Sequence, residues 1–258
     1  MLPALCRLLC AGCLLGPGRP PSDDAPAVHS FLYRPAYCTD AALRGPAEPY
    51  LPQPGDLFFA TDESFLMRAG HRLAGAASPH HSGVVVALPD GRLGLLEAGP
   101  FHTTEVGVYD LLPELEGYTR QGLVWLRRRR TPLTAEQSAR LTAFARAQQG
   151  KSFAAWRLVG QLTPFRSRGP LRTRCLGKPH GDRRRWICSE LVVEALVAAG
   201  LLDAATARPA ATFPRDLFFD RSPNPYLNRT LDLSACWCPP ARWASCPGPA
   251  APPGPKIE

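Results

Sequence analysis

Cys188 stands where a cysteine thiol would be activated as a nucleophile. Apolar residues precede it, and the sequence from Cys188 to Leu196 has the pattern of an amphipathic helix. A sulfur at the beginning of a helix faces unpaired backbone N–H groups and the positive end of the helix dipole, and both lower the thiol pKa. A cysteine in such a position can equally be a buried structural thiol. The prediction of catalysis therefore depends on the residues that accompany it.

Two adjacent histidines are candidate bases for this thiol. His81 opens the run from His81 to Leu88, whose valines indicate a β-strand that would hold an imidazole rigidly. A thiolate beside a histidine is the minimum set for nucleophilic acyl transfer. His80 is the alternative base, and because side chains alternate across a strand, only one of the two can face the thiol.

Glu97 is the candidate third member of the site. The turn Pro89-Asp90-Gly91 has the form of a three-residue hairpin loop, which would pair Leu88 with Arg92. That register places Glu97 and His81 on the same face as diagonal neighbours, about 7–8 Å apart at Cα. A carboxylate there would fix the imidazole tautomer, the third role in a nucleophile–base–orienter set. A two-residue loop would shift the register and leave Glu97 as a strand-end carboxylate paired with an arginine.

The elements that position these residues predict an α+β protein with a small, mostly antiparallel sheet packed against helices. Thr134 begins a capping box for a helix that Gly150 ends, and Gly200 ends the Cys188 helix. A further helix is predicted over residues 64–75. Strands are predicted at residues 57–59, 81–88, 92–97, 106–109 and 123–127.

The chain is expected to fold as one domain with extensions at both ends. Residues 51–235 would form the catalytic domain, after an apolar leader (1–18) and a Pro- and Ala-rich linker or arm (19–50). Residues 236–258 are Pro-rich and are expected to be a disordered tail.

The leader, from Met1 to Gly18, contains the segment Leu9-Cys10-Ala11-Gly12-Cys13. This segment resembles the lipobox of bacterial lipoproteins, in which a cysteine is acylated after cleavage. Cys10 stands where leucine is usual, and Arg7 interrupts the apolar run. We expect export to the bacterial cell envelope, with membrane anchoring through a lipidated Cys13 favoured over simple secretion. A plain N-terminal extension of a cytoplasmic protein is the alternative.

The other cysteines indicate disulfides more than a metal site. Nine cysteines are present, of which three belong to the leader and one is Cys188. One or two disulfides could form among the remaining five in an oxidising compartment: Cys38, Cys175, Cys236, Cys238 and Cys246. The Cys236–Cys246 cluster lacks a fourth ligand at metal spacing, so no zinc site is expected.

The charge does not indicate a nucleic-acid partner. The formal net charge is +8, but the basic residues are scattered and no nucleic-acid motif is present. Arg183 to Arg185 precede the nucleophile closely enough to attract an anionic substrate, although a solvated loop is the interpretation that we favour.

The motifs together resemble the permuted papain-like cysteine hydrolases, in particular the YiiX/YaeF-type amidases, relatives of the NlpC-type cell-wall peptidases and the lecithin–retinol acyltransferases. The resemblance covers about residues 52–220 and depends on the order of four segments: Gly55-Asp56-Leu57-Phe58-Phe59, His81-Ser82-Gly83-Val84-Val85, Leu96-Glu97-Ala98 and Cys188-Ser189-Glu190-Leu191-Val192. It implies a circularly permuted papain-like fold, with a small antiparallel sheet or half-barrel in which the histidine strand precedes the cysteine helix.

The same resemblance implies the site roles and the reaction. His81, which stands directly before a small residue and a glycine, would be the base in preference to His80. Cys188 would be the nucleophile and Glu97 the orienter, with no metal or organic cofactor. We expect a thiol amidase or peptidase, acting through an acyl-enzyme on a small-molecule, peptide or lipid amide or ester, with cell-wall peptides as one candidate. The alternatives are an acyltransferase or lipid hydrolase with the same three residues, and an envelope lipoprotein that only binds.

Overall fold

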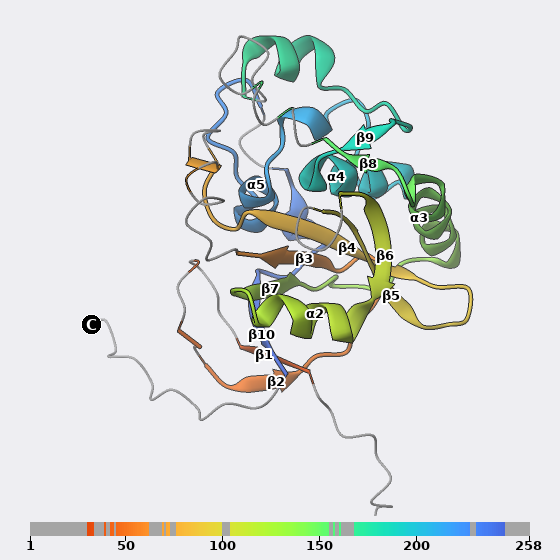
Figure 1. The fold of residues 1–258 in the computed structure, drawn as a ribbon, viewed down its shortest axis with the longest axis vertical. Helices are drawn as coiled ribbons and strands as arrows, with labels where there is room; N and C mark the ends of the chain where they lie inside the picture. The colour runs from red at the N-terminus through yellow and green to blue at the C-terminus, as the bar shows by residue number, and fades with distance from the viewer. Residues whose placement is uncertain are drawn as a thin grey trace, which may run out of the picture.

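The computed structural model describes residues 30–33, 39, 42–43, 45–61, 69, 71–72, 76–99, 104–154, 157, 160, 168–227 and 231–245. The fold is α+β, as predicted, and its centre is an eight-stranded sheet with the order β2-β1-β10-β7-β3-β4-β5-β6 (Figure 1). All neighbouring strands in this sheet are antiparallel. Its strands are β1 (Phe31–Tyr33), β2 (Ala47–Pro49), β3 (Leu57–Ala60), β4 (His81–Ala87), β5 (Leu93–Ala98), β6 (Val106–Asp110), β7 (Val124–Arg127) and β10 (Ala241–Ala244). A separate parallel pair joins β8 (Ser152–Phe153) to β9 (Arg185–Trp186).

Helices cover both faces of the sheet. The α-helices are α2 (Leu111–Thr119), α3 (Ala135–Gln148), α4 (Cys188–Ala198) and α5 (Pro214–Phe219). A π-helical turn (Arg172–Leu176) and two 3₁₀ turns (Pro209–Ala211 and Leu233–Ala235) complete the described elements. In Figure 1, α4 and α5 lie above β3 and β4, α3 lies to the right of β6, and α2 lies below β3 and β4.

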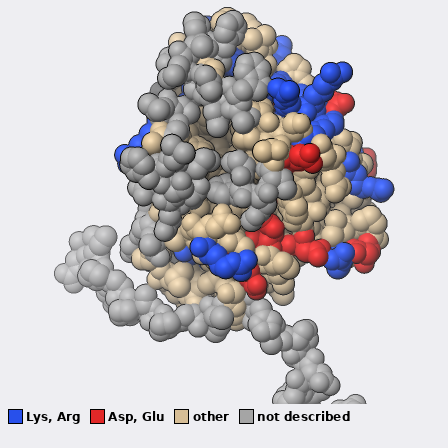
Figure 2. All heavy atoms as spheres, viewed as in Figure 1, with Lys and Arg blue, Asp and Glu red and all other residues tan. Residues whose placement is uncertain are grey.

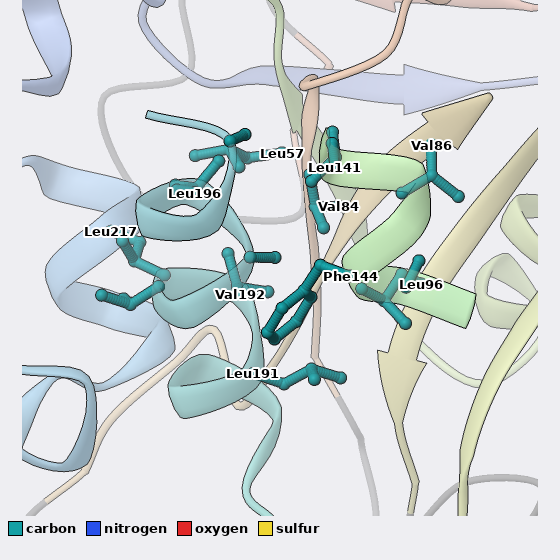
Figure 3. Packing of buried hydrophobic residues seen from close by; sticks show 14 of the residues in the cluster. Leu57, Val84, Val86, Leu96, Leu141, Phe144, Leu191, Val192, Leu196 and Leu217 are labelled. Carbon is teal, nitrogen blue, oxygen red and sulfur yellow. The ribbon is translucent and has the colours of Figure 1, made fainter. Parts of the chain in front are cut away.

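The side chains of β3 alternate between the two faces of the sheet and so belong to two separate hydrophobic cores. Leu57 and Phe59 pack into the larger core with α3, α4 and α5, while Phe58 and Ala60 pack into the smaller one with α2. Figure 3 shows the larger core, where α4 packs against the sheet, α3 and α5. The residues labelled there are Leu57, Val84, Val86 and Leu96 from strands, Leu141 and Phe144 from α3, Leu191, Val192 and Leu196 from α4, and Leu217 from α5. The Cys188 helix is therefore fixed along most of its length by buried apolar contacts.

The predicted helix ends are confirmed. Thr134 Oγ1 accepts from Gln137 N at 3.1 Å, and Gln137 Oε1 accepts from Thr134 N at 3.1 Å, so the capping box is complete. Gly150 and Gly200 both adopt left-handed backbone after their helices, with φ of 79° and 71°.

The predicted hairpin register is also confirmed. Leu88 N donates to Arg92 O at 2.9 Å, and Gly91 has a φ of 82°, as the three-residue loop requires. The pairing then runs back along the two strands to place Gly83 opposite Glu97. The three-residue loop therefore describes this hairpin, and the two-residue alternative is wrong.

The expected limits of the folded body, 51–235, were too narrow. The arm contributes β1 and β2 to the sheet, and the segment assigned to the tail contributes β10, which lies between β1 and β7. Buried Leu32 and Trp243 anchor these strands. They escaped prediction because each has only three or four residues and lies among prolines, which favour an irregular chain in a sequence reading. The leader and residues 246–258 lie outside the described residues, as does most of the helix predicted over 64–75.

Within the described ranges, no helix has both the length and the apolar character needed to cross a membrane.

Candidate active site

Cys188 is the first residue of α4, as the sequence predicts. The chain reaches it through β9, whose pairing with β8 fixes the direction of approach. Trp186 is buried and donates from Nε1 to Gln148 Oε1 at 3.1 Å, which ties this approach to α3. Ser189 Oγ donates to Thr212 O at 2.7 Å on the other side of the helix. The nucleophile candidate is therefore held by contacts on both sides, and its own side chain is 5% exposed.

His81 and Glu97 form a direct hydrogen bond. His81 Nε2 lies 2.8 Å from Glu97 Oε2, and both side chains are buried. The bond depends on the hairpin register, because Gly83 opposite Glu97 makes His81 its diagonal neighbour on the same face. A Cβ at Gly83 would lie 2.9 Å from Leu96 O, so the strand needs glycine at this position. The predicted orienter is thus in contact with the predicted base.

The other partner of His81 is Cys188. Burial alone would lower the pKa of His81, but its hydrogen bonds and charge interactions with Cys188 and Glu97 outweigh burial and raise the pKa to about 10. Because Nε2 is bonded to Glu97, Nδ1 is the ring nitrogen that remains for the sulfur. The imidazole therefore lies between the sulfur and the carboxylate and carries a proton at neutral pH.

The pKa of the Cys188 thiol shifts in the opposite direction, downward. Burial raises the pKa of the Cys188 thiol, but the hydrogen bond and the positive charge of His81 lower it below its ordinary value. The backbone N–H groups of Ser82 and Ser189 also hydrogen bond to the sulfur and lower the pKa further. The Ser189 N–H lies at the N-terminus of α4, where unpaired donors were expected to favour a thiolate. This geometry supports a thiolate–imidazolium pair.

Two aromatic residues that the sequence did not single out complete the surroundings of His81. Tyr118, from α2, donates from its hydroxyl to Glu97 Oε2 at 2.7 Å and stacks on the imidazole with centroids 5.4 Å apart. Phe58 meets the imidazole edge-on at 6.0 Å. Glu97 Oε2 therefore accepts from both Tyr118 and His81. No local pattern marks Tyr118, since its contact with Glu97 exists only after α2 packs on the sheet.

Tyr118→Phe is expected to lower the free energy of unfolding by about 1–2 kcal/mol, because it removes one donor from a buried carboxylate while keeping the aromatic stack. Urea unfolding at pH 7 measures the loss. Tyr109→Phe is the matched control, since Tyr109 lies on β6 and is partly exposed. An equal loss in both variants would show that the Tyr118 hydroxyl has no special role.

The remaining predicted residues are distributed as follows. His80 contacts the ring of His71 at 4.6 Å, so it is not the base. Cys175, Cys236 and Cys238 are free thiols, whereas Cys13, Cys38 and Cys246 lie outside the described residues. In the part of the chain that the structure describes, no three His, Cys, Asp or Glu residues are grouped so that they could hold a metal ion.

Beyond Cys188, α4 carries two buried carboxylates. Glu190 pairs with Arg157 Nη1 at 2.6 Å and with Arg183 Nη1 at 2.9 Å. Glu194 accepts from the backbone N–H groups of His180 and Gly181 at 2.7 and 3.0 Å. The helix that presents Cys188 thus also fixes the basic segment that precedes it. The favoured interpretation of Arg183 as a solvated residue was wrong, since its side chain is 15% exposed.

No protein-family model matches the chain. A search of curated proteins also finds no match. Among solved structures, the chain is similar to a crystal structure described as the metalloprotein yiiX from Escherichia coli O157:H7, DUF1105. The TM-score is 0.40 and the identity 19%, over 58% of this chain and 67% of that chain. A likeness at this level assigns neither a family nor an activity to this chain.

Proposed function

We propose that the protein is a cysteine hydrolase with a permuted papain-like fold, which cleaves amide bonds through an acyl-enzyme on Cys188. The observation that carries the proposal is the buried His81, which is hydrogen bonded to Glu97 and lowers the pKa of the Cys188 thiol. The thiol pKa is lowered and the imidazole pKa raised, which is the pairing that an activated thiol requires. A structural thiol has no need of a buried histidine held by a buried carboxylate.

The reaction proceeds in two steps. The Cys188 thiolate attacks the amide carbonyl carbon, and the carbonyl oxygen takes the negative charge of the tetrahedral intermediate. As the C–N bond breaks, His81 gives its Nδ1 proton to the departing amine, which leaves a thioester on Cys188. A water molecule then attacks the thioester while His81 accepts its proton. The C–S bond breaks, the acid departs and the thiolate–imidazolium pair is restored.

Glu97 and Tyr118 position the base in this scheme. The bond from His81 Nε2 to Glu97 keeps a proton on Nε2, so Nδ1 is the nitrogen that exchanges protons with sulfur and substrate. The Tyr118 hydroxyl holds the carboxylate, and its ring covers the imidazole face. Both residues restrict the rotation of groups that must stay within hydrogen-bond reach of the sulfur.

The substrate that we propose is an amide of a peptide, with cell-wall peptides as the candidate for an exported enzyme. The apolar leader and its lipobox-like segment ending at Cys13 support export to the cell envelope. No metal or organic cofactor takes part in the scheme, because the thiolate and the imidazolium supply the nucleophile and the acid.

The pH dependence of Cys188 alkylation tests the proposal. Cys188 of the folded chain is expected to react rapidly with iodoacetamide at pH 6, as followed by mass spectrometry of the peptide that contains it. The midpoint of its rate–pH curve should lie well below the free-thiol pKa of about 8.5. The same peptide in the urea-unfolded chain is the control and should titrate near that value. Cys175, an exposed free thiol, provides a second comparison in every sample. A folded-state midpoint at or above the unfolded one would remove the basis for a thiol hydrolase.

A further inference from the structure

Five arginines line a cavity of about 500 Å³ beside the β8–β9 pair. Its wall includes Arg157, Arg172, Arg183, Arg184, Arg185 and a single carboxylate, Asp182. Figure 2 shows Lys and Arg side chains gathered on the surface in the region of β8 and β9, with few acidic side chains among them. Arginine presents paired N–H groups that match the oxygens of carboxylates and phosphates, so a concave arginine cluster has the chemistry of an oxyanion site.

The cavity wall is fixed by the catalytic helix. The buried Glu190 carboxylate binds Arg157 and Arg183 and holds two guanidinium groups in place. Arg157 Nη2 also donates to Arg185 O at 3.3 Å. Glu194, one turn further along α4, holds the backbone at His180 and Gly181. A site whose side chains are already ordered loses less conformational entropy when it binds a ligand.

The charges of the wall do not balance. Among the described residues, three carboxylates lie on or behind the wall, Asp182, Glu190 and Glu194, and Asp182 is also paired with Lys151. Five arginines against three carboxylates leave an excess of two positive charges before Lys151 is counted. Burial lowers the pKa of Arg172, and the nearby charges of Arg157 and Arg183 lower it further, which a bound anion would reverse.

The cavity lies close to the start of α4. A narrow crevice shares Arg157 and Arg172 with the cavity and is also lined by Ile187 and Ser189, the residues on either side of Cys188. Cys188 itself is not part of that lining, so the arginines lie beside the start of the helix and not on the sulfur.

We propose that the substrate carries an oxyanion, a carboxylate or a phosphate, which binds this arginine cavity while the scissile amide lies at Cys188. The inference rests on the proposed function and adds the charge of the substrate to it. Binding energy from a remote anionic group would place the carbonyl against the thiolate.

Calorimetric titration with inorganic phosphate and with acetate tests the cavity directly. The unmutated chain is expected to bind at least one of the two anions, and the Arg172→Gln/Arg184→Gln double variant should bind at least tenfold more weakly. These two residues are chosen because the ion pairs of Glu190 with Arg157 and Arg183 are kept. Arg146→Gln, an exposed position on α3, is the matched control for loss of charge and should bind like the unmutated chain. The anion that binds more tightly identifies the group that the cavity prefers, a phosphate or a carboxylate.

A comparison of two alkylating reagents tests whether the charge of the cavity acts on reactions at the Cys188 sulfur. Iodoacetate and iodoacetamide have nearly the same size and the same leaving group but differ by one negative charge. The ratio of their rates at Cys188 is expected to fall about threefold in the double variant at low salt and to stay constant in Arg146→Gln.

The outcomes separate the two proposals. Absence of anion binding by the unmutated chain, or equal binding by the double variant, would overturn the anion site even where Cys188 reacts as a thiolate. An unchanged reagent ratio in the double variant would overturn the connection to the nucleophile. An inert Cys188 in a chain that binds phosphate through these arginines would instead overturn the hydrolase.

Discussion

Replacing His81 by alanine is expected to slow the alkylation of Cys188 at pH 6 by about a hundredfold. Burial raises the thiol pKa, and His81 is the main group that lowers it. Without the imidazolium, the pKa should rise to that of an ordinary thiol or higher, so about one sulfur in a thousand would be ionised at pH 6. A thiolate of higher pKa is intrinsically more nucleophilic, which restores about one of these three orders of magnitude.

His80→Ala is the matched control, because it removes an imidazole from the neighbouring residue that contacts His71 and not the sulfur. Its alkylation rate at pH 6 should change by less than about twofold. Glu97→Gln should give an intermediate loss, since it removes the negative charge beside His81 but keeps an oxygen that can accept from Nε2. Equal rates in the unmutated chain and His81→Ala would show that the thiol is not activated by this histidine.

The sequence predicted the hairpin of β4 and β5 because its register follows from one turn. The loop Pro89-Asp90-Gly91 leaves little choice of geometry, and side-chain alternation then determines which face Glu97 occupies. The capping box at Thr134 and the glycine after each long helix are local signals of the same kind. Such features were predictable because the residues that determine them are neighbours in the chain.

The parts that sequence reasoning missed depend on tertiary packing. A proline and a glutamate near its start indicate the helix α2, but nothing local indicates that Tyr118 would contact Glu97 on β5. β1 and β10 each have only three or four residues and lie among prolines, and they pair across more than 200 residues of chain. The arginine cavity likewise forms only in the fold, where Glu190 pairs with both Arg157 and Arg183. In the sequence, Glu190 has the pattern of an ordinary helix carboxylate.

Asp56 supports the largest stability prediction. Asp56→Ala is expected to lower the free energy of unfolding by about 3–5 kcal/mol. The carboxylate is fully buried and accepts from Arg129 N at 2.7 Å, from the Tyr50 hydroxyl at 2.9 Å and from Gln53 N at 3.2 Å. Alanine would leave these donors buried without an acceptor, at a cost of about 1–3 kcal/mol each before relaxation. Urea unfolding at pH 7 measures the loss.

The same residue predicts a pH dependence of stability. Burial raises the pKa of Asp56 to about 6, although hydrogen bonds from Arg129, Tyr50 and Gln53 oppose the rise. The folded chain therefore binds a proton at Asp56 between about pH 4 and pH 6 that the unfolded chain has released. Stability from this group is then greatest below pH 4 and falls by about 3 kcal/mol as the pH rises to 6 and beyond. In Asp56→Ala this component of the pH dependence should be absent.

Asp90→Ala is the matched control for both measurements. Asp90 is a turn aspartate whose contacts with Arg92 are exposed, so its loss should leave the free energy of unfolding and its pH profile unchanged within error. Asp56 precedes β3, and β3 pairs with the strand that begins at His81. Loosening this end of β3 should therefore also reduce the rate of Cys188 alkylation in Asp56→Ala under conditions where the variant is still folded. A folded Asp56→Ala with the stability and reactivity of the unmutated chain would show that this buried carboxylate does not support the strand that carries His81.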